Sequence, residues 1–290
     1  MINLFKWLFI ALFSILNLTS FAQDDQVIEL FRQAKEYSEN ENYLKAIKTY
    51  QKALDLNVGK YNYALYLNMG CCYAALAEHH LAIEHFDMAL LHNVDDYEAF
   101  TCRGNSNTFL GHYEKAIKDH KEAIRILENQ AGEDLDIAYY NLGDCFRRWG
   151  KFDSAIVYYE ESLEYEHKDV STRMNIAFTY IEMQRYQLAE AHLLELIEEV
   201  PEISNNHNNL GFVYLQLGDL EKAEKYVLDA QKIEPENSWV YRNLGLIHKA
   251  KGEKKQACKQ LDKALKLEFV KYWGTDYIQE LLDYCNQPAE

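Results

Sequence analysis

The sequence contains little proline, little glycine and little positive charge. Three Pro and 12 Gly among 290 residues are too few for an all-β fold that depends on many tight turns. Lys and Arg number 30 against 46 Asp and Glu, so the net charge is −16. Nucleic acids and anionic lipids need a basic surface, so neither is expected as the general partner, although one local basic patch stays open. The 48% hydrophobic content indicates a folded protein with a sizeable core.

Long apolar segments are also lacking, and the one short apolar run lies at the N-terminus. After a single Lys, residues 7–18 are apolar except for two positions, whereas a membrane span needs roughly 20 residues. The small residues Ser20 and Ala22 then precede Gln23. This order is typical of a secretory signal peptide, so we expect the first 22 residues to be removed and the mature charge to be −17. Export to the periplasm or outside the cell follows. An uncleaved membrane anchor is the alternative, which the short apolar run disfavours.

A period of 34 residues runs through the rest of the chain. Asn-Leu-Gly or a close variant recurs, with its third residue at Gly70, Gly143, Ala177, Gly211 and Gly245. The last four of these are 34 residues apart, and Gly104 falls 34 after Gly70. An alanine follows 12 residues after each, at Ala82, Ala116, Ala155, Ala189, Ala223 and Ala257. A fixed period of this length is the mark of a repeat protein.

At these residues the chain resembles the tetratricopeptide repeat (TPR) family. The family pattern has Leu at position 7, Gly or Ala at 8, Tyr at 11, Ala at 20, an aromatic at 24, Ala at 27 and Pro at 32 of each repeat. Seven repeats are expected, over 27–60, 63–96, 97–130, 136–169, 170–203, 204–237 and 238–271. The third is the most divergent, with Asn107 at position 11 and His120 at position 24. The resemblance implies an all-α fold, a right-handed superhelical solenoid of helix-turn-helix repeats.

The physical pattern favours the same fold. Within each repeat the apolar residues recur with the helical period. A small residue at position 8 facing Ala at position 20 lets two antiparallel helices pack closely, and Gly at position 15 suits a left-handed residue after a helix end. One helix pair cannot bury its apolar face alone, so the pairs must stack. Residues 272–290 are expected to hold a capping helix from Thr275 to about Asn286, with Tyr277 on its apolar side.

The six cysteines are interpreted mostly as small buried hydrophobic residues rather than as a disulfide framework. The repeat register places Cys71 and Cys102 on neighbouring helices, which leaves a bridge between them open.

Catalytic signatures are lacking. The sequence has no Walker loop, GxGxxG, GxSxG, HExxH or CxxC motif. The most metal-like group is His79, His80, Glu84 and His85, which we interpret as a solvated turn and helix start, with a metalloprotein or hydrolase as the remote alternative. We therefore expect no enzyme activity, no metal and no cofactor.

The resemblance implies a concave inner surface formed by the first helix of each repeat. Carried over position by position, it assigns to a partner-binding groove Phe109, Tyr140, Asn141, Arg147, Arg148, Asn175, Phe178, Asn209, Phe212, Trp239, Arg242 and Asn243. Aromatic rings there would serve as anchors, Asn amides would bond an extended backbone and Arg would bind a carboxylate. The alternative is that the Asn residues belong to the ordinary repeat pattern and that some rings pack between neighbouring repeats.

The sequence thus predicts a non-catalytic, exported scaffold that binds an extended peptide or a protein partner. One alternative is a structural protein that self-associates through the uncovered first repeat, at Leu30, Phe31 and Ala34. Another is a sensor component whose effector lies on a different chain.

Overall fold

The computed structural model describes residues 23–56, 58–130 and 132–287, so the predicted signal peptide lies outside the described residues. Residues 23–39 are helical. The following elements are α2 (Tyr43–Asp55), η1 (Gly59–Tyr61), α3 (Asn62–Ala75), α4 (His79–His92), α5 (Tyr97–Phe109), α6 (Tyr113–Gln130), α7 (Leu135–Arg148), α8 (Phe152–Tyr165), α9 (Val170–Glu182), α10 (Tyr186–Glu199), α11 (Ser204–Leu217), α12 (Leu220–Ile233), α13 (Ser238–Ala250), α14 (Lys254–Lys266), α15 (Phe269–Trp273) and α16 (Gln279–Asn286).

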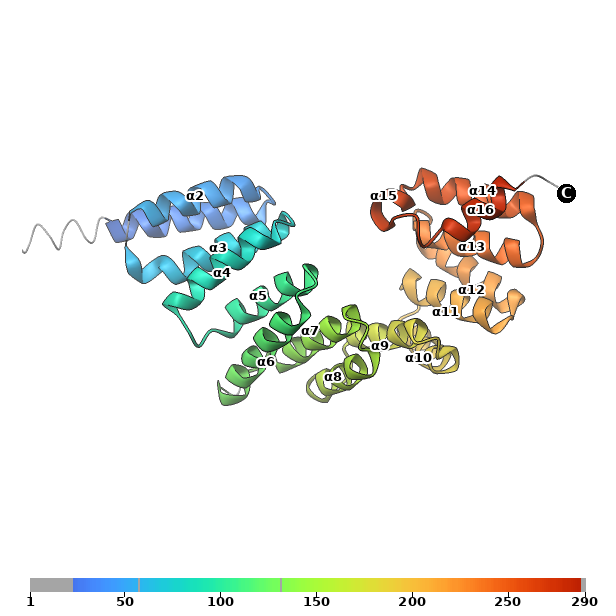
Figure 1. Ribbon diagram of the computed structural model, residues 1–290, viewed down its shortest axis with the longest axis horizontal. Coiled ribbons are helices and arrows are strands. Elements are labelled where there is room, and N and C mark those ends of the chain that lie inside the picture. The colour runs from blue at the N-terminus through green and yellow to red at the C-terminus, as the bar shows by residue number, and fades with distance from the viewer. Residues whose placement is uncertain (1–22, 57, 131, 288–290) are drawn as a thin grey trace, which may run out of the picture. The chain divides into compact units, whose positions relative to one another are not determined.

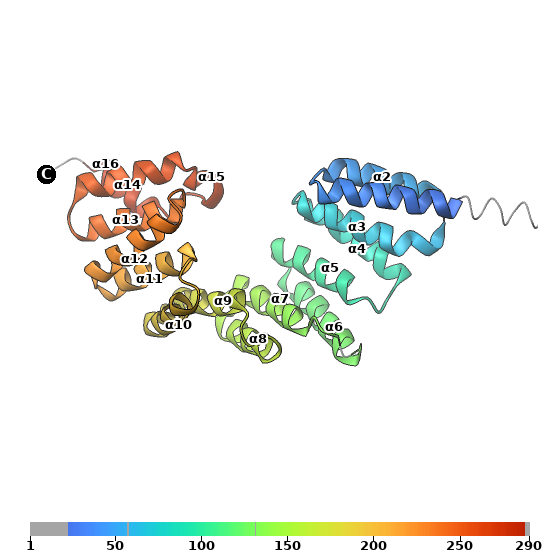
Figure 2. The same ribbon diagram turned by 180° about the vertical axis from the view of Figure 1, so that it is seen from behind.

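The helices pack in two compact bodies, which we call the N-terminal body (to Tyr158) and the C-terminal body (from Tyr159). In each body consecutive helices form antiparallel pairs, and each pair packs on the next in chain order (Figure 1; Figure 2 shows the reverse side). Helices stacked in sequence order are the architecture of a helical solenoid, so the predicted fold class is confirmed.

Small residues control the distance between the two helices of a repeat. The alanines at position 20 are all buried. A Cβ atom on Gly211 would lie only 2.3 Å from Cγ2 of Val227 and 3.0 Å from the carbonyl oxygen of Ala223. Because real Cβ atoms do not approach so closely, α11 packs against α12 at a separation that only glycine allows there.

The turn between the two helices uses a left-handed residue at position 15 in every repeat. Four of these are glycines, with φ between 74° at Gly111 and 84° at Gly218, as the sequence predicts. The other three repeats place Glu41, Ala77 and Gln184 there, at φ 57° to 60°. Side chains with a Cβ are strained in this conformation, so these three turns are the less stable ones.

The C-terminal cap differs from its prediction. The chain after α14 forms the short helix α15 and then α16, which begins at Gln279 rather than at Thr275. Leu281 of α16 is fully buried, and its Cδ1 would lie 2.9 Å from a Cβ on Gly245, so α16 covers the last repeat.

A disulfide between Cys258 and Cys285 joins this cap to α14, with Cα atoms 5.6 Å apart. The interpretation of these two cysteines as buried thiols is therefore wrong. The spacing of 27 residues crosses from a repeat into the cap, where the repeat register gives no guide to which side chains meet. Cys71 and Cys102, between which the sequence left a bridge open, are both free thiols.

Candidate functional site

The predicted groove residues fall on both bodies, and each set forms its own surface. In the N-terminal body the side chain of Phe109 is 60% exposed at the end of α5. The His79 ring stacks on it with centroids 4.7 Å apart and planes 6° apart. The Arg148 guanidinium lies 5.0 Å from the same ring centroid. Burial lowers the pKa of His79, so this ring is neutral at physiological pH and stacks as an aromatic rather than as a cation.

Arg147 and Arg148 share one carboxylate. Arg147 donates to Oδ1 of Asp144 at 2.8 Å, and Nε of Arg148 donates to Oδ2 of the same residue at 2.7 Å. Asp144 therefore offsets part of the positive charge of this pair. The arrangement holds Arg148 over Phe109 but weakens its attraction for a carboxylate of a partner.

In the C-terminal body the indole of Trp239 is the centre of an aromatic cluster built partly by the cap. Its ring centroid lies 4.9 Å from Phe269, 5.5 Å from Trp273 and 5.3 Å from Tyr277, each in an edge-to-face arrangement. Phe269 is buried, whereas Trp273 and Tyr277 are 50% and 56% exposed. Tyr277 was expected on the apolar side of the cap, and the structure instead leaves half of it in solvent.

Arg242 is fixed within this cluster. Its guanidinium carbon lies 5.1 Å from the Phe212 ring centroid and 5.6 Å from that of Trp239. Nε donates to the carbonyl oxygen of Tyr277 at 2.9 Å, and a terminal nitrogen donates to Asn243 at 2.7 Å. Burial lowers the pKa of Arg242 to about 10, which still leaves it charged at neutral pH.

Asn243 does not reach solvent. It is 2% exposed, and its amide nitrogen donates to Oδ1 of Asn208 at 3.0 Å. Together with the contacts of Arg242, this makes both residues part of the support under the rings rather than groups held out to a partner.

The other predicted groove residues keep some exposure. Phe178 on α9 is 36% exposed, at the same repeat position as Phe212 on the adjacent helix α11. The half-buried members are Tyr140, Asn141, Asn175 and Asn209. Trp273 is not among the predicted groove residues, because it lies beyond the last repeat, where the family pattern assigns no inner position. Its only signal was the run of aromatic residues between 269 and 277. We name the set Phe178, Phe212, Trp239, Trp273 and Tyr277 the aromatic surface.

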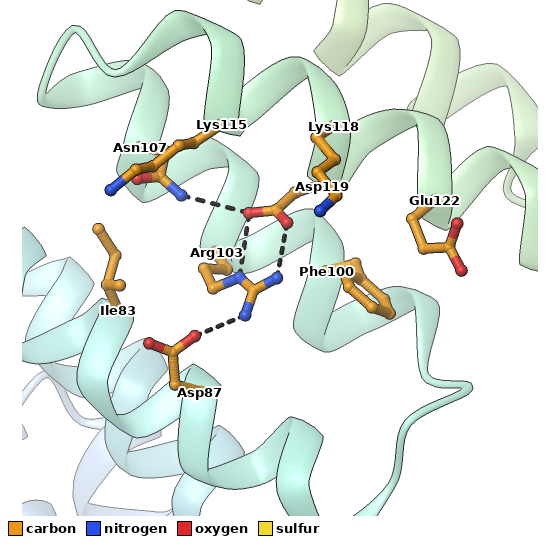
Figure 3. Close-up of a pocket in the computed structure, with 9 residues that line it drawn as sticks. All are labelled: Ile83, Asp87, Phe100, Arg103, Asn107, Lys115, Lys118, Asp119 and Glu122. Carbon is orange, nitrogen blue, oxygen red and sulfur yellow. Dashed lines mark hydrogen bonds and ion pairs between the residues drawn. The ribbon is translucent and has the colours of Figure 1, made fainter.

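Repeat three contains a polar hollow between α4, α5 and α6, with a volume of about 560 Å³ (Figure 3). Arg103 stands at position 7, where the family has Leu. Its Nε and a terminal nitrogen donate to the two oxygens of Asp119 at 3.0 and 2.7 Å, and the other terminal nitrogen donates to Asp87 at 2.5 Å. Asn107 donates to Asp119 at 3.2 Å. Three N–H groups of the guanidinium are bonded to two carboxylates, so the cluster replaces apolar packing at this position with ion pairs.

His120 lies beside this cluster and is buried to 1% exposure. A Cβ on Gly104 would lie 2.7 Å from its Cε1, so the ring packs directly against the glycine of position 8. Within the described part of the chain neither ring nitrogen has a hydrogen-bond partner. Burial lowers the pKa of His120 to about 4.

The histidines singled out in the sequence do not assemble into a ligand set. His85 bonds the carbonyl oxygen of Leu81 through Nδ1, and His79 stacks on Phe109. Among the described residues no three His, Cys, Asp or Glu side chains are placed to hold a metal ion. None of the described helices is long and apolar enough to cross a membrane.

Three family models, each described as a tetratricopeptide repeat, match this chain. They cover residues 96–165, residues 204–237, and residues 30–57 with 240–270, which together exceed half of its length. Human tetratricopeptide repeat protein 6 is 29% identical over 82 residues. That match spans 28% of this chain and only 15% of the human protein.

Solved structures show the same fold. A tetratricopeptide repeat protein from Parabacteroides merdae superposes with a TM-score of 0.74 at 20% identity, covering 91% of this chain and 100% of that one. The pilF protein of Pseudomonas aeruginosa gives a TM-score of 0.60 at 17% identity, covering 76% and 96%. At these identities the likeness concerns the fold alone.

Proposed function

Because the chain belongs to the tetratricopeptide repeat family, we propose that it is a non-catalytic scaffold that binds an extended segment of a partner protein on the aromatic surface. Proteins of this family serve as protein-interaction scaffolds. The observation that carries the proposal is the exposure of Phe178, Trp273 and Tyr277, three large rings on the side of the first helices. Exposed aromatic residues on a rigid support are what protein interfaces use as anchors.

The geometry favours apolar side chains in the partner. Arg242 is already bonded to Tyr277 and Asn243 and lies over two rings, so it stiffens the surface instead of binding a carboxylate. Rings held in place lose little conformational entropy on binding, which leaves more of the contact energy as affinity. The partner segment is therefore expected to contribute aliphatic or aromatic residues rather than a terminal carboxylate.

We also propose that the protein acts outside the cytoplasm. The apolar run before Gln23 and the small residues at positions 20 and 22 support export. The disulfide between Cys258 and Cys285 supports it independently, because such bonds persist in oxidising compartments and are rare in the cytosol. N-terminal sequencing of protein from the native cell tests the point, with Gln23 as the expected first residue and Met1 as the contrary result.

The binding proposal is tested by affinity capture with the mature protein as bait. A variant with Phe178→Ala, Trp273→Ala and Tyr277→Ala should lose the proteins that the wild type retains, as identified by mass spectrometry. The matched control is Tyr165→Ala, which removes a ring of 51% exposure from the second helix α8. Retention of the same proteins by the triple variant, with an unchanged circular dichroism spectrum, would rule out the aromatic surface.

A further inference from the structure

The second helices of the last three repeats differ sharply in charge. All three belong to the C-terminal body, where α10, α12 and α14 follow one another (Figure 1). Helix α10 contains four Glu and no Lys or Arg, α12 contains three acidic and three basic residues, and α14 contains five Lys and one Asp. The charge therefore runs from −4 through 0 to +4 and sums to zero, in a chain whose net charge is −16.

The gradient is ordered by repeat position. Residues at the same position of successive repeats occupy equivalent places in the stack. At position 26 the three helices carry Glu195, Asp229 and Lys263, and at position 29 they carry Glu198, Lys232 and Lys266. Acidic residues thus occupy both positions at one end of the row, basic residues occupy both at the other, and the middle helix has one of each.

Five of these six side chains project into solvent, whereas Asp229 is half-buried. Glu195 is 70% exposed, and its carboxylate lies 4.0 Å from the guanidinium of Arg173. Lys232 is 76% exposed and contacts Asp229 at 2.8 Å, a surface pair of the kind that contributes little stability. Glu198, Lys263 and Lys266 are exposed as well.

The basic end carries an electrostatic cost within its own chain. Lys255, Lys259 and Lys263 are spaced four residues apart on α14, and like charges at this spacing destabilise a helix by a few tenths of a kcal/mol per pair. Lys259, Lys263 and Lys266 line a hollow of about 390 Å³. An acidic surface placed against them would relieve this repulsion.

We propose that this row of helices is a self-complementary interface, on which a second copy of the chain packs in antiparallel orientation. A two-fold axis through α12 places α10 of each copy against α14 of the other. Glu195 and Glu198 then face Lys263 and Lys266 at both ends, and Asp229 of one copy faces Lys232 of the other near the axis. In a two-fold interface the same patch serves both partners, and a gradient that changes sign about its middle helix is complementary to its own copy.

Apolar residues between the charges add contact area. Leu194 on α10 and Leu228 on α12 both stand at position 25 and are each 38% exposed. In the antiparallel arrangement Leu228 of one copy lies close to Leu228 of the other, on either side of the two-fold axis. This surface is formed by second helices, so it is separate from the aromatic surface and leaves the first helices available.

A second copy fits this face better than an anionic membrane or another polyanion. Such a partner would be attracted to α14 but repelled by α10, because the row carries opposite charges at its two ends. Only an occupant with the reverse gradient satisfies the whole row, and the chain itself presents that gradient.

The test is sedimentation equilibrium of the mature protein in low salt and in about 0.5 M NaCl, where the Debye length falls to about 4 Å. We expect a dimer in low salt whose dissociation constant rises about tenfold or more in high salt. A wild-type protein that stays monomeric in low salt at high concentration overturns the proposal. The same holds if that monomer binds anionic lipid vesicles, because the occupant would then be a membrane rather than a second copy.

Charge reversal gives the sharper result. The variant with Lys263→Glu and Lys266→Glu has two acidic ends, and the variant with Glu195→Lys and Glu198→Lys has two basic ends. Each alone should be monomeric, because like charges then meet at both contacts. Mixed in equal amounts they should form a one-to-one heterodimer, since every contact regains opposite charges.

The matched control is Lys48→Glu with Lys52→Glu, which makes the same charge change on the exposed face of α2 in repeat one. It should dimerise like the wild type. Equal dimerisation of the control and of both charge-reversed variants would place the dimer contact elsewhere and contradict the proposal. Circular dichroism of every variant checks that exposed helical substitutions leave the fold intact.

Discussion

His120 should make the stability of the protein depend on pH. The folded protein holds this ring neutral, because burial lowers its pKa from the ordinary 6.5 to about 4. On unfolding the ring enters water and recovers its ordinary pKa. Between those two values the unfolded chain therefore binds the extra proton and the folded chain does not, so acidification favours unfolding.

The magnitude follows from the two pKa values. The contribution of His120 to the free energy of unfolding is fully present above pH 6.5 and declines as the pH falls toward 4. Each unit of pKa difference corresponds to about 1.4 kcal/mol, so the full loss is about 3 kcal/mol, of which about 2 kcal/mol has occurred by about pH 5. The charge of Asp144 favours the protonated ring and opposes the effect of burial, and the pKa of about 4 already includes it.

The matched variant is His120→Phe. Repeat two already places Phe86 at this position, and its Cε1 lies 2.5 Å from where a Cβ on Gly70 would be, so the same packing accepts a phenylalanine ring. The variant should also be more stable at neutral pH by about 1–3 kcal/mol, because two buried nitrogens without partners are removed.

The assay is urea unfolding of the wild type and of His120→Phe at about pH 7.5 and about pH 5. For each protein the free energy of unfolding is compared between the two pH values, and the difference between the proteins isolates His120 from all other titrating groups. The wild type should lose about 2 kcal/mol more than the variant. Equal losses in the two proteins would refute the assignment of a buried neutral ring.

Three further changes test other features of the fold. Arg103→Leu should cost about 3–5 kcal/mol in urea unfolding because it leaves the carboxylate of Asp119 buried without its cation, whereas Arg103→Leu combined with Asp119→Leu should restore most of that loss. A double variant as unstable as Arg103→Leu alone would show that the stranded carboxylate is not the cause. Ala77→Gly should raise stability by about 1 kcal/mol, since this residue has φ 60°, and a lower melting temperature would count against strain there. Cys258→Ser should destabilise the protein by about 3–4 kcal/mol through loss of a cross-link spanning 27 residues, and the reduced wild type should be as unstable as this variant. A wild-type melting temperature that does not change with reductant would contradict this.

The fold was predictable because the repeat constrains packing at every step. A residue without a bulky side chain recurs every 34 residues where two helices cross, as at Gly211 against Val227, and this period is typical of repeats built from helix pairs. The left-handed residue at position 15 could be predicted for the same reason, because each repeat places its turn at the same position. At Ala77 and Gln184 the turn persists without glycine, since the packing of the flanking helices imposes the conformation.

The candidate site was less predictable, because it depends on segments outside the period. The family positions identified Trp239 and Phe212 but not Trp273, which the cap brings to them. They also suggested that Arg242 and Asn243 would meet a partner, whereas hydrogen bonds to Tyr277 and Asn208 hold both in place. Whether an inner position is exposed depends on neighbours that a single repeat does not contain.

The most direct test of the scaffold function is photo-crosslinking in the native cell. A benzophenone amino acid is placed at Phe178 in one protein and at Tyr165 in another, because both aromatic side chains reach solvent on different sides of the repeats. Recognition on the aromatic surface predicts a discrete adduct with one partner protein from position 178 and none from position 165. An absence of adducts at 178, or the same adducts from both positions, would contradict the central claim.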